Sequence, residues 1–125
     1  MSENSNYKDL VVWQKAIQFA EDVITLSEDL NTRNKHFRLI EQLEAAATSV
    51  PMNIAEGKGR SSRKEFSHFL MIARGSLFET LTLLEIFTRK NWIQPENYHQ
   101  IENQANEIAK MINSLNNRLK EPPNK

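Results

Sequence analysis

The stretch Gly57-Lys58-Gly59-Arg60-Ser61-Ser62-Arg63-Lys64-Glu65 separates two long amphipathic segments. Glycine is enriched just beyond helix ends, so Gly57 and Gly59 are expected to end one helix. Ser62, followed three residues later by Glu65, is a capping-box pattern and predicts the start of the next helix. The stretch therefore predicts two helices joined by a short turn, and this pairing decides the fold class.

Two helices are expected before this turn. The first is expected from about Asp9, which would cap it, to Leu30. Its predicted core stripe consists of Trp13, Ala16, Ile17, Ala20, Val23 and Ile24, and a second apolar stripe consists of Val12, Phe19 and Leu26. After the polar turn 31–35, the second helix has as inward residues Phe37, Ile40, Leu43, Ala47, Val50 and Ile54. Pro51 lies within it and predicts a kink or a short break at 47–51.

Two helices are also expected after the turn. The third extends to about Arg89, and Asn91 is a plausible stop. Pro95 suits the first turn of the fourth helix. Its apolar stripe consists of Tyr98, Ile101, Ala105, Ile108, Ile112, Leu115 and Leu119. Four such helices predict an all-α, antiparallel, up-down-up-down four-helix bundle in one domain, 1–125, with residues 1–6 and 121–125 disordered.

Composition narrows the function classes. The 125 residues suit one domain, and three Gly and four Pro favour long helices. The absence of cysteine excludes disulfides, thiolate catalysis and cysteine-based zinc sites. Because no apolar run reaches about 20 residues, we expect a cytoplasmic protein without a membrane partner. Sixteen basic and sixteen acidic residues cancel, so any case for nucleic acid must come from where the charges lie.

The third helix is apolar around most of its circumference, which is typical of a helix buried on most sides. Its apolar residues are Phe66, Phe69, Leu70, Met71, Ile72, Ala73, Leu77, Phe78, Leu81, Leu83, Leu84 and Phe87. Gly75 would permit close approach of another backbone. We therefore expect a homo-oligomer whose interface includes Val12, Phe19, Leu26, Met71 and Phe78. The alternative is a single bundle with one wide apolar face.

The sequence gives little evidence of a catalytic or metal-binding site. Glu-x-x-His occurs as Glu65-Phe-Ser-His68 and Glu96-Asn-Tyr-His99, and di-iron bundles use two such motifs. Both lie in first turns, which antiparallel packing would place roughly 30 Å apart. The glycine-rich stretch lacks Walker spacing and a preceding strand. We predict no catalytic residue, metal or cofactor, and no enzyme activity.

Basic residues crowd the turn between the second and third helices: Lys58, Arg60, Arg63 and Lys64. The termini, with Lys8, Arg118, Lys120 and Lys125, are expected at the same bundle end. In a ring-like oligomer such ends would repeat around an axis and offer phosphate backbones a multivalent surface. The alternative is an ordinary solvated rim of mixed charge.

Four motifs stand in order along the chain: 7–16, 49–57 with Gly59-Arg60-Ser61, 65–70, and 73–77 with Glu79. Together, over about residues 7 to 93, they resemble the four-helix-bundle proteins encoded in intervening sequences of bacterial 23S ribosomal RNA genes. The resemblance implies an antiparallel bundle, commonly a homopentamer, with a suspected role in RNA binding. A related bundle is the accessory subunit of diversity-generating retroelement reverse transcriptases, so a nucleic-acid-processing protein is a second implied partner.

The polar residues that match the family are Asn53, Glu56, Gly57, Arg60, Glu65, Arg74, Gly75, Ser76 and Glu79. We expect them to serve structure and assembly, with Asn53 and Glu56 binding backbone groups freed by Pro51 and Arg60 bridging Glu56 and Glu65. The family usually carries basic residues where this chain has Glu44 and Ala45, which weakens any RNA surface on the second helix.

The leading expectation is a non-enzymatic, RNA-associated or adaptor bundle. The alternative is a protein-interaction scaffold, or an accessory subunit of a reverse transcriptase, without RNA binding of its own.

Overall fold

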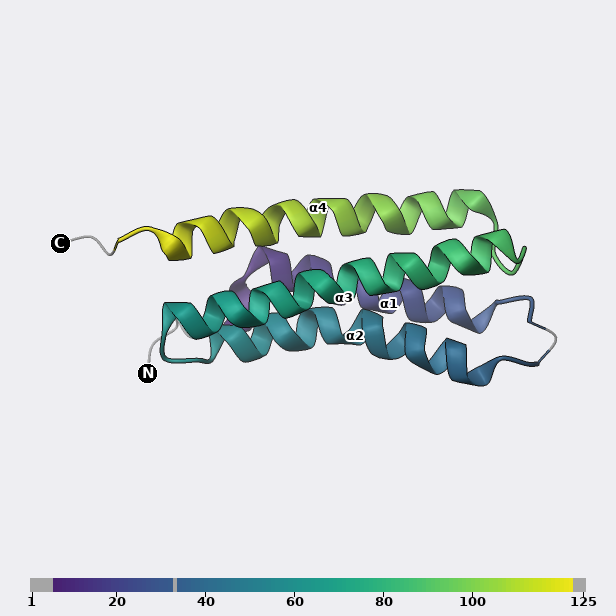
Figure 1. Ribbon diagram of the computed structural model, residues 1–125, viewed down its shortest axis with the longest axis horizontal. Coiled ribbons are helices and arrows are strands. Elements are labelled where there is room, and N and C mark those ends of the chain that lie inside the picture. Colours follow the sequence, from purple (N-terminus) through teal and green to yellow (C-terminus); the bar gives the residue numbers. More distant parts are fainter. Residues whose placement is uncertain (1–5, 33, 123–125) are drawn as a thin grey trace.

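The computed structural model describes residues 6–32 and 34–122. A 3-10 turn, η2 (Tyr7–Asp9), precedes four helices: α1 (Val11–Glu28), α2 (Phe37–Lys58), α3 (Arg63–Arg89) and α4 (Pro95–Lys120). Figure 1 shows the four helices side by side. Within the described residues there is no strand, so the predicted all-α class is confirmed.

Each helix packs against two others, α1 against α2 and α4, and α3 against α2 and α4. The α1–α2 and α3–α4 connections lie at one end of the molecule, and the α2–α3 turn lies at the other (Figure 1). The pair α1–α2 and the pair α3–α4 therefore form opposite sides of the four-helix arrangement.

The chain enters the bundle differently from the prediction. Asp9 ends η2 and does not cap α1, which follows Leu10 without a side-chain cap. Asn6 caps η2 instead, through a bond of 2.9 Å from the Lys8 NH to its Oδ1. Of the termini predicted to be disordered, 1–5 and 123–125 lie outside the described residues.

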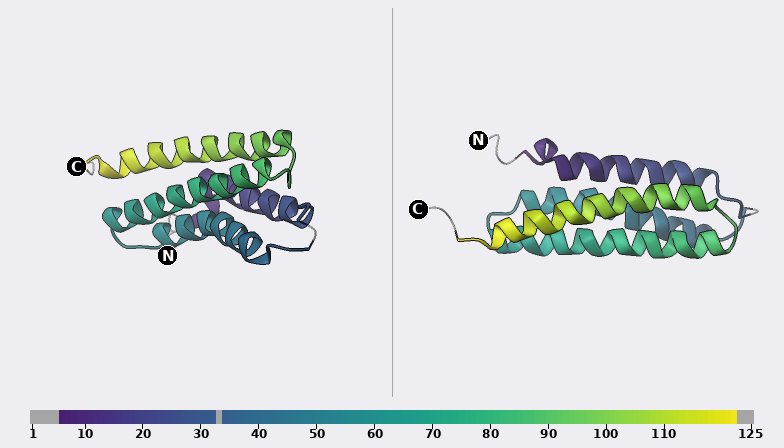
Figure 2. Two further views of the ribbon diagram at one scale, coloured as in Figure 1. Left: turned by 45° about the vertical axis from the view of Figure 1, so that its right-hand side comes forward. Right: turned by 90° about the horizontal axis from the view of Figure 1, so that it is seen from above.

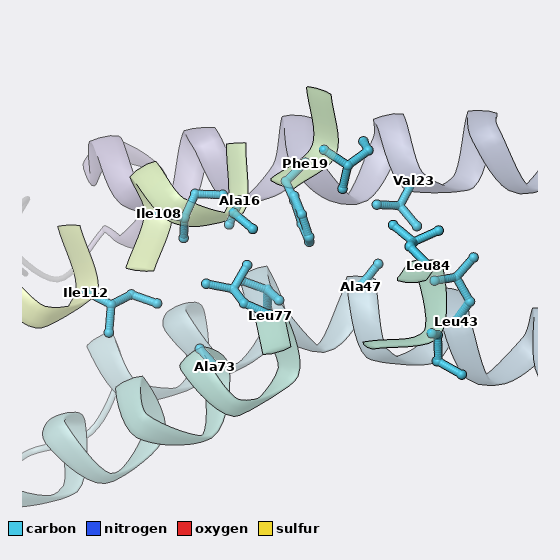
Figure 3. Close-up of a cluster of buried hydrophobic side chains, with 14 of the residues drawn as sticks. Ala16, Phe19, Val23, Leu43, Ala47, Ala73, Leu77, Leu84, Ile108 and Ile112 are labelled. Atoms are coloured by element: carbon cyan, nitrogen blue, oxygen red, sulfur yellow. The ribbon is translucent and has the colours of Figure 1, made fainter. Parts of the chain in front are cut away.

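The inward face of α1 only partly matches the predicted one: Ala16, Ala20 and Val23 are buried as predicted, and Val12 and Phe19 of the second stripe are buried with them. Its buried residues are Val12, Ala16, Phe19, Ala20, Val23 and Ser27. Ile17, predicted to be in the core, is 40% exposed. Figure 3 shows Phe19 among buried side chains of the other helices. Because an aromatic ring removes more apolar surface from water than an isoleucine, burying the face with Phe19 is favoured.

The second helix runs continuously through Pro51, which is buried. Figures 1 and 2 show α2 changing direction near its middle, so the proline bends the helix without breaking it. Leu43, Ala47, Val50 and Ile54 are fully buried, as predicted. Phe37 is 63% exposed, contrary to the prediction, since it is the first helical residue at the end of the bundle.

Both ends of α3 follow the sequence signals. Ser62 Oγ accepts a bond of 3.1 Å from the Glu65 NH, which confirms the predicted cap. At the other end Asn91 adopts a left-handed φ of 63°, and the Trp92 NH donates to the Phe87 carbonyl at 2.9 Å. These are features of a Schellman motif, which ends the helix as predicted near Asn91. Pro95 is the first residue of α4, also as predicted.

Candidate functional site

The end of α2 and the start of α3 lie close together. Gly57 is buried inside the last turn of α2, so it does not end the helix as predicted. A Cβ atom built on Gly57 would lie 2.8 Å from Phe69 Cβ and 2.9 Å from Phe66 Cδ1. Gly57 therefore permits the two helices to approach each other. The basic turn, which contains Lys58, Arg60, Arg63 and Lys64, directly follows this contact in the chain.

Polar side chains bind α2 to α3 farther along the same seam. Ser49 Oγ and Ser76 Oγ are 2.8 Å apart, and Asn53 Nδ2 donates to both the Oγ and the carbonyl of Ser49 at 2.8 Å. The carbonyl that Pro51 deprives of a donor is that of Ala47, so Asn53 binds a backbone group other than the predicted one. This cluster fixes the register of α2 on α3.

Among the other polar residues that match the family, Arg74 makes a contact within the bundle, whereas Gly75 and Glu79 are exposed. Arg74 Nη1 donates to Asn113 Oδ1 on α4 at 2.7 Å. Gly75 is exposed, and a Cβ atom there would meet nothing within 4 Å. Glu79, one turn on, is also exposed. Gly75 and Glu79 are therefore available to another molecule, whereas Arg74 is engaged in the α3–α4 contact.

Two of the four basic turn residues are engaged within the subunit. Arg60 pairs with Glu56 at 2.6 Å, and its guanidinium lies 4.9 Å from the centroid of the Phe69 ring. The structure gives no corresponding Arg60–Glu65 bond among the described residues. Arg63 donates to the carbonyls of Glu121 at 2.9 Å and Arg118 at 3.2 Å, closing the end of α4.

The remaining two members of the basic turn are lysines. Lys58 is half-buried and Lys64 is exposed. Glu44, which stands where the family usually has a basic residue, accepts a bond of 2.6 Å from Ser27 Oγ of α1. Its carboxylate therefore serves the α1–α2 contact. Of the four basic residues of this turn, Lys58 and Lys64 are therefore the two that the arginine contacts described above leave for a phosphate.

An apolar groove of about 420 Å³ runs between α1 and α2. Ile17, Ile24, Pro51 and Met52 are among the side chains that line it, and Met52 is 66% exposed. The only charged residue among its described lining residues is Glu21. Such a concave apolar face on a small protein is typical of a protein interface.

A second, different groove of about 390 Å³ lies on the opposite side, between α3 and α4. Phe78, 49% exposed, and Ile86, 46% exposed, form its apolar part. Partial burial raises the pKa of Tyr98, which also lines it, and the nearby Glu102 carboxylate adds to this shift. A hydrogen bond from Arg89 lowers the pKa of Glu85 at the rim. This groove is more charged than the first.

The predicted interface residues have separate locations. Val12 and Phe19 are buried core residues, so their assignment to an oligomer interface is wrong. Leu26 and Met71 are half-buried against the core, and Phe78 is exposed. Sequence reasoning missed Ile17 and Ile24, because the two stripes of α1 are similarly apolar and only the packed partner decides which one turns inward. It also missed Met52 on α2, which is in none of the predicted apolar stripes.

The histidines of the two Glu-x-x-His motifs do not meet. His68 lies near the start of α3 and His99 near the start of α4, at opposite ends of the bundle. Among the described residues no group of three histidine, cysteine or acidic side chains could hold a metal ion. None of the described helices is both long enough and apolar enough to cross a membrane.

Comparison with known proteins agrees with these features. The family model for the 23S rRNA-intervening sequence protein matches residues 8–114. A crystal structure of a protein of unknown function from the S23 ribosomal protein family of Bacteroides thetaiotaomicron is similar, with 33% identity, a TM-score of 0.79, and coverage of 85% of this chain and 98% of that chain. Comparison with curated proteins gives no match. The chain belongs to the 23S rRNA-intervening sequence protein family.

Proposed function

We propose that this up-down-up-down bundle is a non-enzymatic cytoplasmic subunit that assembles with copies of itself into a ring, and that the ring binds RNA. The observation that carries the assembly is the pair of unlike apolar grooves on opposite sides of the subunit, one on α1–α2 and one on α3–α4. The lack of cysteine suits a reducing cytoplasm.

The two grooves favour a head-to-tail contact. A twofold dimer uses the same patch on both subunits, whereas two different patches on opposite sides join each subunit to the next. Repetition of that contact closes into a ring when the rotation between subunits permits it. The homopentamer implied by the family resemblance is one such ring.

The RNA part of the proposal depends on repetition. In a ring, the lysines at the basic turn, Lys58 and Lys64, would recur on every subunit at the same face. Several weak phosphate contacts then act together, as multivalent binding requires.

A protein-interaction scaffold without RNA is the second candidate. The engagement of Arg60 with Glu56 and of Arg63 with backbone carbonyls favours it, because both guanidinium groups then serve the fold. In this candidate a nucleic-acid-processing protein, such as a reverse transcriptase, would bind the ring.

Filter binding of structured RNA at several salt concentrations distinguishes the two candidates. The RNA proposal predicts retention at low salt, a steep fall as salt rises, and weaker binding when Lys58 and Lys64 are both changed to Ala. The matched control is Lys15→Ala with Lys110→Ala, which removes two lysines from the helix bodies. No retention at low salt would leave the scaffold candidate.

A further inference from the structure

The bundle end opposite the basic turn contains a pocket of about 410 Å³ between the α1–α2 and α3–α4 connections. Figure 1 shows these two connections at the same end. The NH of Asn31 donates to the carbonyl of Trp92 at 3.2 Å and so ties one connection to the other. The pocket is therefore built by residues far apart in the sequence, whose backbones are joined by this hydrogen bond.

Cations line this loop pocket. Lys35 comes from the first connection and Lys90 from the second, and both are exposed. None of the seven described lining residues is acidic. The first turn of α2, which begins beside Lys35, also lacks an acidic residue, and His36 makes no side-chain capping bond there. The positive end of the α2 dipole and the negative end of the α3 dipole both lie at this pocket, so the attraction for an anion comes chiefly from the two ammonium groups.

An aromatic stack forms the other part of the lining. The ring of His36 lies on that of Trp92, with centroids 4.7 Å apart and planes tilted by 31°. Trp92 contacts Phe87 in turn, at 5.0 Å, and Phe87 is fully buried. His36 is exposed. The stack therefore offers an exposed aromatic ring that is connected to the core through Trp92 and Phe87.

Two residues that line the pocket have a left-handed backbone conformation. His36 has a φ of 67° and Asn91, beside Trp92, has a φ of 63°. Such values are uncommon for residues other than glycine, and Asn91 adopts its value as the residue that ends α3.

We propose that the loop pocket binds an unpaired nucleotide of an RNA strand, with its base on the His36–Trp92 stack and its phosphate between Lys35 and Lys90. The inference rests on the proposed RNA association and adds to it a site for a single-stranded segment at the end of the bundle opposite the basic turn. Aromatic platforms with adjacent cations bind unpaired bases, whereas a base within a duplex is already stacked on its neighbours.

Trp92 provides a direct probe. The chain has two tryptophans, so Trp13→Phe leaves Trp92 as the single source of tryptophan emission. At low salt, we expect a single-stranded oligoadenylate to quench this emission, and adenosine monophosphate to do so only at higher concentration. Duplex RNA is expected to leave the emission unchanged.

Variants then assign the signal to the pocket. His36→Ala is expected to weaken the oligoadenylate affinity roughly fivefold or more, in line with the loss of one base stack. Lys35→Ala with Lys90→Ala is also expected to weaken it, and Lys15→Ala with Lys110→Ala is the control of equal charge change. Quenching that is equal for duplex RNA, or unaffected in both pocket variants, would overturn the inference.

The two proposals fail differently. If filters retain RNA while Trp92 emission does not respond, the loop pocket is not the site, and the proposed RNA association stands. If filters retain no RNA and emission does not respond, both proposals are overturned.

Discussion

Gly57 packs so closely on Phe69 that a Cβ atom on the glycine would lie 2.8 Å from the Cβ of the phenylalanine. Gly57→Ala should therefore force α2 and α3 apart and lower the free energy of unfolding by about 1–3 kcal/mol, the usual cost of overpacking. Gly59→Ala is the matched control, because its nearest neighbouring atom is 3.6 Å away. Urea unfolding measures both. Equal effects of the two substitutions would contradict a steric role for Gly57.

The Ser49–Ser76 bond should show coupling in a double-mutant cycle. Ser49→Ala leaves the buried Ser76 hydroxyl without this bond, at a cost of about 1–3 kcal/mol. Ser76→Ala should cost less, because the half-buried Ser49 hydroxyl still accepts a bond from Asn53. Ser49→Ala with Ser76→Ala removes both partners, so it should cost less than the sum of the single changes. Additive free energies of unfolding would show that the bond does not couple α2 to α3.

Arg63 should act as a clamp on the end of α4. Arg63→Ala removes the donors to the carbonyls of Arg118 and Glu121. We expect faster hydrogen exchange of amides in the last turn of α4 and a loss of about 1 kcal/mol in global stability. Lys64→Ala, at the exposed neighbouring position, should leave exchange in α4 unchanged. Protection of α4 that survives in the Arg63 variant would argue against the clamp.

Gly75 should be replaceable within an isolated subunit. Since a Cβ atom there meets nothing within 4 Å, Gly75→Ala should raise the free energy of unfolding by roughly 0.5–1 kcal/mol. Because assembly would complicate the measurement, both proteins should also carry Met52→Glu in the α1–α2 groove. A loss of stability on adding Gly75→Ala would mean that the helix backbone at this position is not free.

Tyr98 should make the fold less stable in alkali. Burial raises its pKa in the folded state above the usual value of 10.0. The contribution of Tyr98 to the free energy of unfolding is therefore fully present below about pH 10, and it is lost as the pH rises through the folded-state pKa. Tyr98→Phe should reduce this alkaline decrease while leaving the profile near neutral pH unchanged. Unfolding curves from neutral pH to above pH 10 measure it, and identical slopes for both proteins would contradict the assignment.

The sequence predicts the helices better than their faces. Local signals determine the helix ends at Ser62, Asn91 and Pro95, since caps and turns depend on neighbouring residues. The inward face of α1 depends on distant partners, so the sequence does not show which of its two apolar stripes is buried. Ile17 is therefore predicted to lie in the core, where the structure has Phe19.

The candidate sites show the same limit. Four basic residues close in sequence suggest one phosphate site, yet Arg60 and Arg63 bind groups of their own subunit. Conversely, Lys35 and Lys90 are separated by two helices, and only the fold brings them to one pocket. Side chains that converge from distant segments leave no local pattern in the sequence.

The central claim is head-to-tail assembly through two unlike faces, and light scattering of mixed variants tests it most directly. Met52→Glu disables the α1–α2 groove, and Phe78→Glu disables the α3–α4 groove. The native chain should form an oligomer, and each variant alone should be a monomer of about 14.5 kDa. An equimolar mixture retains one intact pair of faces and should form a heterodimer of twice that mass. A monomeric native chain, or a Met52→Glu variant that still dimerises alone, would contradict the account.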